Sequence, residues 1–192
     1  MKKITAKPRP ILTPQLVQML ATYNPDGSVD VMNAAWGGQL DADVIILSLS
    51  ADHKTVENLR RTGCFTLGIP SSKDVIDADF VGLVSANDDP NKFEKTDWHA
   101  SKSAVIDAPV IDELPMTFEC KVLRYIDEDE LGFYVIARVV DILFNEDILN
   151  DKGQPDVNRM DLLLFSPIDA SYRKMSDIVA PAFRCGAAKK GK

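Results

Sequence analysis

The chain has few of the residues that hold metals or form disulfides. Its 192 residues include two histidines, His53 and His99, and three widely spaced cysteines, Cys64, Cys120 and Cys185. Two histidines cannot build a multi-histidine metal site, so we expect no bound metal. An odd number of cysteines without a C-x-x-C pair fits free thiols in a reducing compartment, and we expect no redox role for them.

Long apolar runs and an excess of positive charge are also missing. No apolar stretch approaches the roughly 20 residues that span a bilayer, and the basic residues near the N-terminus have no apolar segment behind them, unlike a signal peptide. The formal net charge is −7, which argues against broad contact with nucleic acid or an anionic membrane. We therefore expect neither partner and, by default, a cytoplasmic protein.

Several motifs of common enzyme families do not occur. The sequence has no G-x-G-x-x-G, no G-x-x-x-x-G-K-[ST], no H-E-x-x-H and no G-x-S-x-G. These absences argue against a Rossmann dinucleotide site, a P-loop, a zincin site and a nucleophile elbow. A Ser-His-Asp triad has no local support, and we assign no catalytic acid, base or nucleophile.

The composition is that of one globular domain. Apolar residues make up 45% and charged residues 27% of the chain, values typical of such proteins, and roughly 100–200 residues is one domain's length. We expect a single domain over residues 1–192 with its core over about residues 8–175. The basic end suggests that residues 186–192 form a disordered tail.

Turn residues divide the first part of the chain into strands. Pro25 and Gly27 suit a turn at 24–27, so residues 16–23 and 28–36 are predicted to pair as a hairpin. Residues 44–50 are too uniformly apolar for a strand with one wet face. Residues 64–69 form a further expected strand, which ends at Pro70.

Helices are predicted at three places. Asp52 can cap a short helix that runs to about Thr62, with Gly63 as the residue after its end. Residues 74–86 place apolar side chains at helical spacing. A further helical turn or two is expected within residues 91–99, after Pro90.

The second half of the chain is predicted to be rich in strands. Apolar and polar residues alternate over 116–122, the pattern of a half-buried strand. Residues 127–130 read as a charged connection, 133–144 as a long strand, 150–155 as a loop and 162–165 as the last strand. About six or seven strands with inserted helices predict a mainly β fold, a closed antiparallel barrel of Greek-key type.

Polar residues gather at the start of the helix after residue 52. His53, Lys54 and Thr55 fall in its first turn, where unpaired N–H groups and the positive end of the helix dipole favour an anion. Lys54 adds a charge and Thr55 a hydroxyl, and Ser48 and Ser50 face the same side of their strand. The pattern predicts a phosphate site; the alternative is a solvated helix start without a ligand.

Small residues and one aromatic precede this cluster. Asn33, Ala34, Ala35 and Trp36 end a strand, and two glycines follow. Alanine and glycine let backbone N–H and C=O groups approach a flat heterocycle, Asn33 offers a donor and an acceptor, and Trp36 can form a wall. The alternative is a core tryptophan beside a tight turn.

In this order, the residues resemble the flavin reductase-like family of FMN-binding split barrels, which includes flavoredoxins and NAD(P)H:flavin oxidoreductases. The resemblance covers roughly residues 8–175. The stretches that carry it are Asp26-Gly27, 31–36, Ser48-Leu49-Ser50, His53 to Leu59, 65–70, Asn91-Lys92-Phe93 and Glu119 to Val122.

The resemblance implies an FMN-binding split barrel, usually a homodimer with FMN near the subunit interface. Asn58 would support the helix start, and Lys92 would approach the phosphate or the flavin from the same chain or from a partner subunit. Lys54 or Lys92 near the flavin would favour its reduced, anionic form. The implied cofactor-binding residues are Asn33, Ala34, Ala35, Trp36, Ser48, Leu49, Ser50, His53, Lys54, Thr55, Asn58, Lys92, Phe165 and Tyr172.

One departure from the family pattern keeps several functions open. Family members often carry a histidine and a G-E-V sequence in the stretch that here spans residues 131–139, and this chain has neither. The first hypothesis is an oxidoreductase that passes electrons from NAD(P)H through FMN to an unknown acceptor. The second is a flavoredoxin-type electron carrier reduced by a protein partner, and the third is a non-enzymatic split-barrel binding protein.

Overall fold

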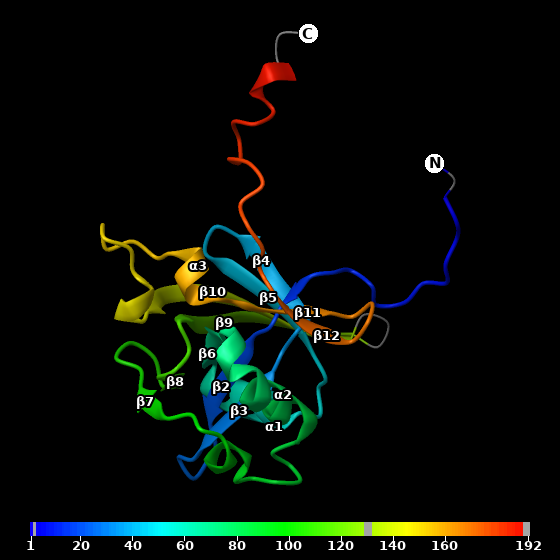
Figure 1. Cartoon of the computed structure of the whole chain (residues 1–192). Coiled ribbons are helices and arrows are strands. Elements are labelled where there is room, and N and C mark those ends of the chain that lie inside the picture. The colour runs from blue at the N-terminus through cyan, green and yellow to red at the C-terminus, as the bar shows by residue number, and fades with distance from the viewer. Residues whose placement is uncertain (2, 129–131, 190–192) are drawn as a thin grey trace.

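A seven-stranded antiparallel sheet forms the centre of the computed structural model, which describes residues 1, 3–128 and 132–189 (Figure 1). Its strands are β2 (Met19–Tyr23), β3 (Val29–Asn33), β4 (Gly37–Asp41), β5 (Val44–Leu49), β6 (Cys64–Ile69), β9 (Met116–Glu128) and β10 (Gly132–Phe144). They lie in the order β3-β2-β6-β9-β10-β5-β4. The mainly β, antiparallel split-barrel fold expected from the sequence is confirmed.

The expected full closure of this barrel is not found, since the sheet has two ends. Within the described residues no ladder joins β3 to β4, although these strands follow each other in the chain. Residues 34–36, which connect these two strands, form hydrogen bonds with the sheet instead. Ala34 N–H donates to the Gln18 carbonyl at 2.7 Å, and Ser48 N–H donates to the Trp36 carbonyl at 2.7 Å. Strand pairing ends at Asn33 rather than at Trp36, and the small residues that follow are held at the opening.

Two smaller sheets complete the β structure. The first contains β1 (Gln15–Leu16), β11 (Leu163–Ser166) and β12 (Ser171–Lys174), and the second is a hairpin of β7 (Ala100–Lys102) and β8 (Pro109–Ile111). The strand expected over 16–23 is therefore two strands in different sheets, because Val17 N–H donates to the Leu163 carbonyl at 3.2 Å. The strand at 162–165 is not the last, since β12 pairs with it.

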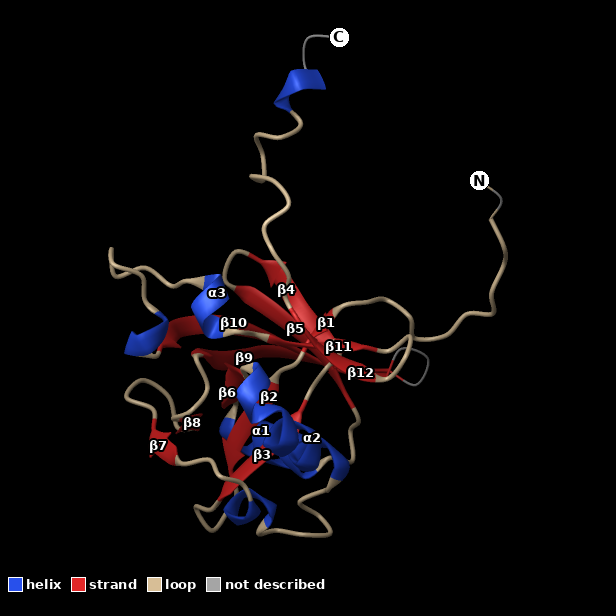
Figure 2. Cartoon of the chain, viewed as in Figure 1, coloured by secondary structure: helices blue, strands red, loops and turns tan. Residues whose placement is uncertain are grey.

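Two helices lie together over β2 and β3 (Figure 2). They are α1 (Lys54–Thr62) and α2 (Val75–Leu83), and α2 ends three residues earlier than expected. The helical turn expected within 91–99 is a single 3-10 turn, Lys92–Lys95. A short α3 (Val157–Met160) and 3-10 turns at Ser72–Asp74, Glu146–Ile148 and Ala187–Lys189 make up the rest.

The start of α1 corrects one prediction. His53, not Asp52, is the N-cap residue, with an extended backbone (φ −67°, ψ 141°). The reason is a preceding turn in which His53 N–H donates to the Ser50 carbonyl at 3.1 Å, which leaves Asp52 inside the turn. Gly63 ends the helix as expected, with a left-handed φ of 67° that favours glycine.

Strand β9 differs from the half-buried strand that its alternation predicts. Thr117 and Glu119 are each 2% exposed. They share a face with Thr66 of the neighbouring strand, which Glu119 opposes in the ladder. That face is covered because the Thr66 hydroxyl donates to the Pro109 carbonyl of β8. The other face of β9 packs into the main hydrophobic core with Cys120 and Phe65.

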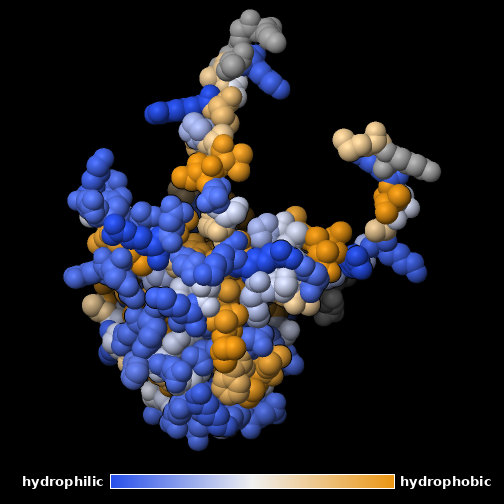
Figure 3. All heavy atoms as spheres, in the orientation of Figure 1, coloured by the Kyte–Doolittle hydropathy of each residue, from blue (hydrophilic) through white to orange (hydrophobic). Residues whose placement is uncertain are grey.

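The two ends of the described chain leave the body as exposed arms (Figure 1). Hydrophobic residues lie along both arms in Figure 3. Near the two ends of the chain, Leu12 is 79% exposed and Val179 is 98% exposed. The last part of the expected tail, 190–192, lies outside the described residues, as do residues 129 and 130 of the expected charged connection; Asp127 and Glu128 belong to β9. Over the described residues, no helix has the length and apolar character needed to cross a membrane.

Candidate functional site

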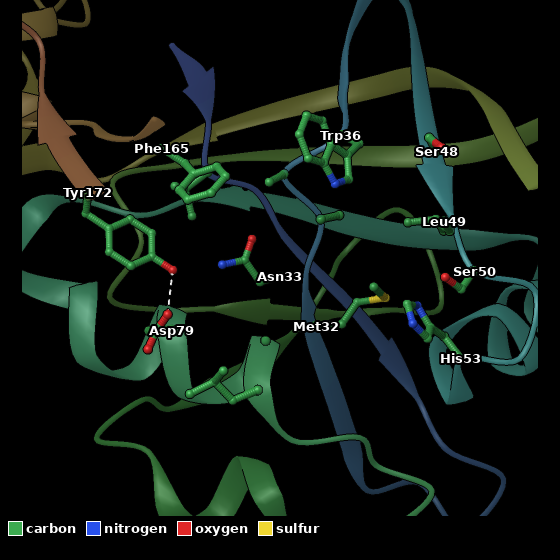
Figure 4. Close-up of a pocket in the computed structure, with 15 residues that line it drawn as sticks. Met32, Asn33, Trp36, Ser48, Leu49, Ser50, His53, Asp79, Phe165 and Tyr172 are labelled. Atoms are coloured by element: carbon green, nitrogen blue, oxygen red, sulfur yellow. Dashed lines mark hydrogen bonds between the residues drawn. The ribbon is translucent and has the colours of Figure 1, made fainter. Parts of the chain in front are cut away.

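A cavity of about 480 Å³, here called the ring chamber, lies where β3, β5, β11 and β12 meet α2. Figure 4 shows Phe165, Tyr172 and Asp79 at one side of it and Ser50 and His53 at the other. Ten of the site residues expected from the sequence line this chamber: Asn33, Ala34, Ala35, Trp36, Ser48, Leu49, Ser50, His53, Phe165 and Tyr172.

A second cavity of about 180 Å³, here called the helix-end cleft, lies at the N-terminus of α1. Three more expected residues, Lys54, Thr55 and Lys92, line it. The chamber and the cleft adjoin each other, because five residues line both: Met32, Asn33, His53, Gly82 and Leu83.

Asn33 is fixed between the sheet and α2. Its side-chain N–H donates to the Ala78 carbonyl at 3.1 Å, while its Oδ1 is buried and has no hydrogen-bond partner among the described residues. The helix comes this close because residue 82 is glycine: a Cβ there would lie 2.9 Å from Asn33 Cβ. The unpaired Oδ1 is an acceptor for a ligand in the chamber.

Replacing Gly82 by alanine is therefore expected to weaken ligand binding without unfolding the protein. The added methyl group must displace Asn33 or α2, whereas alanine in a helix is otherwise about 1 kcal/mol more favourable than glycine. We expect an affinity loss of about tenfold for the chamber's ligand, measured by fluorescence titration, at an unchanged thermal midpoint. Gly38→Ala is the control, because no heavy atom lies within 4 Å of the Cβ added there; equal losses in both variants would contradict the explanation.

Two aromatic rings and a carboxylate form the far side of the chamber. The rings of Phe165 and Tyr172 lie 6.0 Å apart between centroids and are tilted by 52°. The Tyr172 hydroxyl donates to Asp79 Oδ1 at 2.7 Å. Burial, and next the hydrogen bond and charge of Asp79, raise the pKa of Tyr172 to about 12, so the phenol keeps its proton at neutral pH.

Several lining residues were not predicted from the sequence. Asp79, Gly82 and Leu83 come from α2, Met32 comes from β3, and Val17 comes from the link between β1 and β2. The one local signal for Asp79 in the sequence is that this charged residue stands among apolar residues of the helix expected over 74–86. The packing of a helix against the sheet decides which of its residues line the cavity. The periodicity of the sequence predicts the helix but not this packing.

The helix-end cleft has the features of an anion site. The first turn of α1 leaves backbone N–H groups, those of Lys54 and Thr55, without acceptors inside the helix, and the helix dipole adds positive potential. Lys54 Nζ lies 2.9 Å from Glu57 Oε2, and its side chain is 23% exposed. The His53 Nδ1 atom is buried and has no hydrogen-bond partner among the described residues.

A buried ionic network lies behind the cleft. The Thr55 hydroxyl donates to Asp30 Oδ2 at 2.6 Å, and Lys92 Nζ lies 3.8 Å from Asp30 Oδ1. Lys92 also donates to the carbonyls of Val81 at 3.0 Å and Val84 at 2.9 Å. Both charged residues are almost fully buried, Asp30 at 1% and Lys92 at 3% exposed.

This network changes two of the roles expected from the sequence. The Thr55 hydroxyl proton is used on Asp30, so a ligand would meet the backbone N–H of Thr55 rather than its hydroxyl donor. Lys92 reaches the cleft from the same chain, and its ammonium holds the C-terminal carbonyls of α2. Burial lowers the pKa of Lys92, while the charge of Asp30 acts in the opposite direction.

Asn58 lines neither cavity and is fully buried. Its side-chain N–H groups donate to Thr22 Oγ1 at 3.1 Å and to Asn24 Oδ1 at 2.9 Å. These bonds tie α1 to the β2–β3 hairpin, which fixes the helix start relative to the strand that carries Asn33.

Other chemically interesting residues lie outside the site. Arg138, which stands where the resemblance leads one to expect an acid, forms an exposed ion pair with Asp43 at 3.2 Å. Cys64 and Cys120 are buried free thiols and Cys185 is exposed. Burial, then the charge of Glu119, raise the pKa of Cys120 to about 12. In the described part of the chain, no group of three or more His, Cys, Asp or Glu side chains is arranged to hold a metal ion.

The arrangement suits a ligand with a flat ring and an anionic group. The ring chamber offers aromatic walls, small residues and hydroxyls, and the adjoining cleft offers helix N–H groups and a lysine. Within reach of the ring chamber, an acceptor at Asn33 and an unpaired nitrogen at His53 remain for such a ligand. A ring with a phosphate-bearing side chain would occupy both cavities at once.

Comparisons with known proteins agree with this geometry. A family model described as a flavin reductase like domain matches residues 12–166. The solved structure of flavoredoxin from Desulfovibrio vulgaris (Miyazaki F) is similar at 30% identity and a TM-score of 0.89, over 97% of this chain and 100% of that one.

Two further solved structures share the fold. Flavoredoxin from Methanosarcina acetivorans gives a TM-score of 0.89 at 24% identity, over 98% of this chain and 100% of that one. An FMN-binding protein from Thermus thermophilus, with bound 1-cyclohex-2-enone, gives 0.76 at 19% identity, over 94% of this chain and 100% of that one. A search of curated protein sequences gives no match.

Proposed function

This chain belongs to the flavin reductase-like domain family, and from that premise we propose that it binds FMN across the ring chamber and the helix-end cleft and acts as an NAD(P)H-dependent oxidoreductase. Family membership supports a flavin cofactor and a redox function. The observation that carries the proposal is that the two cavities adjoin through Asn33 and His53, so one ligand can fill both.

The residues present fit FMN. Asn33 Oδ1 and His53 Nδ1 are buried without partners among the described residues, which is costly unless a ligand supplies the missing bonds. A hydrogen-bond donor on a flavin ring matches the oxygen of Asn33. A single phosphate matches the N-terminus of α1 with Lys54.

The flavin supplies the hydride and electron transfer chemistry when bound. The protein's own residues bind and orient it. Ala34 and Ala35 allow the backbone to lie close to the ring, and Ser48 and Ser50 offer hydroxyls along its edge. Trp36, 43% exposed, forms the wall toward solvent from which a nicotinamide would approach, since the sequence has no Rossmann turn to bind it elsewhere.

A second candidate function is an electron carrier reduced by a protein partner. Its support is the 30% identity to a flavoredoxin over nearly the whole chain, together with the net charge of −7, which favours docking to a basic partner. In this case NAD(P)H is not a substrate. A third candidate, a split-barrel protein without a redox role, requires that no flavin binds.

We also propose a homodimer in the cytoplasm. Apolar side chains are exposed on β4 and β10, including Leu40 at 54%, Val140 at 41% and Ile142 at 43%, and surfaces of this kind mark interfaces. The three cysteines are free thiols, which fits a reducing compartment.

The visible spectrum of the purified, dialysed protein tests the proposed flavin site and distinguishes the three candidate functions. We expect the bands of oxidised flavin, with FMN released on denaturation, and rapid anaerobic bleaching on addition of NADH or NADPH. Bands that persist with both nucleotides but bleach with dithionite would favour the carrier. Absence of bands even after FMN is supplied would contradict a flavin site.

A further inference from the structure

The ring chamber holds a negative charge where the sequence led us to expect a positive one. Of the described residues that line it, Asp79 is the acidic residue, and no lysine or arginine is among them. The two lysines expected near the flavin line the helix-end cleft instead. Each has an acidic neighbour of its own, Glu57 for Lys54 and Asp30 for Lys92.

The Asp79 carboxylate and the helix that carries it are each held by a hydrogen bond from a strand residue. Its Oδ1 accepts the Tyr172 hydroxyl at 2.7 Å, which ties it to β12. The preceding residue on α2, Ala78, is fully buried, and its carbonyl accepts the Asn33 amide at 3.1 Å. The carboxylate therefore cannot swing away from the chamber without breaking a hydrogen bond between a helix and a strand.

A fixed negative charge beside a flavin acts mainly on one redox state. The oxidised ring is neutral. Uptake of two electrons and one proton leaves one negative charge on the ring, whereas a second proton makes it neutral again. A nearby carboxylate raises the free energy of the anionic form and hardly changes that of the neutral forms.

We propose that Asp79 lowers the reduction potential of the bound flavin and favours protonation of its reduced form. This makes the reduced protein a stronger electron donor, suited to acceptors of low potential. The inference rests on the proposed FMN site. Asp79 acts as a tuning residue: it need not contact the flavin, and the chemistry remains that of the cofactor.

The test is the midpoint potential of the FMN-loaded protein, measured by spectroscopic titration against a reference dye. Asp79→Asn keeps the size of the side chain and removes its charge. We expect the equilibrium between oxidised and reduced flavin to shift about tenfold toward the reduced form, which is about 30 mV for a two-electron couple. The pKa of the reduced flavin, followed by its absorbance, should fall in the same variant.

Two further variants separate charge near the chamber from other effects. Asp79→Glu keeps the charge and should leave the potential close to that of the original protein. Asp77→Asn removes a charge from the same helix outside both cavities, at a side chain that accepts the Asp97 N–H at 3.2 Å, and should also leave the potential unchanged.

The outcomes distinguish this inference from the proposed function. Equal potentials in Asp79→Asn and the original protein, with FMN bound in both, would overturn the inference and leave the FMN site intact. A potential raised equally by Asp77→Asn would assign the effect to net charge and also overturn it. Loss of FMN binding in Asp79→Asn alone would make Asp79 a binding residue and overturn its role as a tuning residue, whereas no FMN binding by the original protein would contradict the proposed function itself.

Discussion

Replacing Lys54 by alanine is expected to raise the Kd for FMN about tenfold to a hundredfold and to leave the Kd for riboflavin nearly unchanged. A hydrogen bond to a charged group contributes about 1.5–3 kcal/mol, and riboflavin lacks the phosphate that this lysine would meet. Lys54 is partly exposed at the first turn of α1, so its removal leaves no buried group unpaired. Flavin fluorescence quenching measures both affinities.

A neighbouring residue provides a variant with the opposite expected sign. Glu57 lies 2.9 Å from the Lys54 ammonium and competes with a phosphate for it. Glu57→Gln should therefore tighten FMN binding by a few-fold and have little effect on riboflavin. Lys95→Ala, which removes an exposed lysine that pairs with Asp89 and lines neither cavity, is the control. Equal losses for FMN and riboflavin in Lys54→Ala would exclude a phosphate role for the lysine.

Replacing Lys92 by methionine is expected to lower the free energy of unfolding by about 3–5 kcal/mol. Removing one partner of a buried ion pair leaves the other charge unpaired, and Asp30 is 1% exposed. The substitution also takes two hydrogen bonds from the carbonyls at the end of α2. Urea unfolding of the flavin-free protein, followed by tryptophan fluorescence, measures the loss.

Two comparisons identify the unpaired charge as the cause. Lys95→Met removes an exposed lysine from the same 3-10 turn and should change stability by less than about 1 kcal/mol. Adding Asp30→Asn to Lys92→Met removes the buried charge and should restore part of the stability. If the loss of unfolding free energy in the double variant equals the sum of the losses in the two single variants, the two residues do not act as a pair.

Much of the fold could be predicted from the sequence because its signals are local. Apolar runs gave the positions of β5, β6 and β10, and the turn at Pro25 and Gly27 gave the first hairpin. The burial of Thr117 and Glu119 could not be predicted. It depends on coverage of their face by residues about 109–114, and nothing in the alternation of β9 encodes that contact.

The site divides in the same way. The residues between 33 and 55 lie at the ends of successive elements, and their order carried the family resemblance from which a shared site was predicted. Asp79 and Gly82 reach the site through the packing of α2, and Lys92 through a buried pair with a residue 62 positions earlier in the chain. The sequence shows these residues but not their neighbours, which is why the sequence analysis named two lysines near the flavin and did not name Asp79.

The position of α2 also bears on how this protein can change during evolution. This helix lines both cavities, yet its own buried residues are Ala78 and Val81. Strands β3 and β5, which line the chamber as well, contribute Met32, Leu47 and Leu49 to the main core, so substitutions there endanger folding. Substitutions in this single nine-residue helix can therefore change ligand preference or redox behaviour among descendants of this chain with the smallest loss of stability.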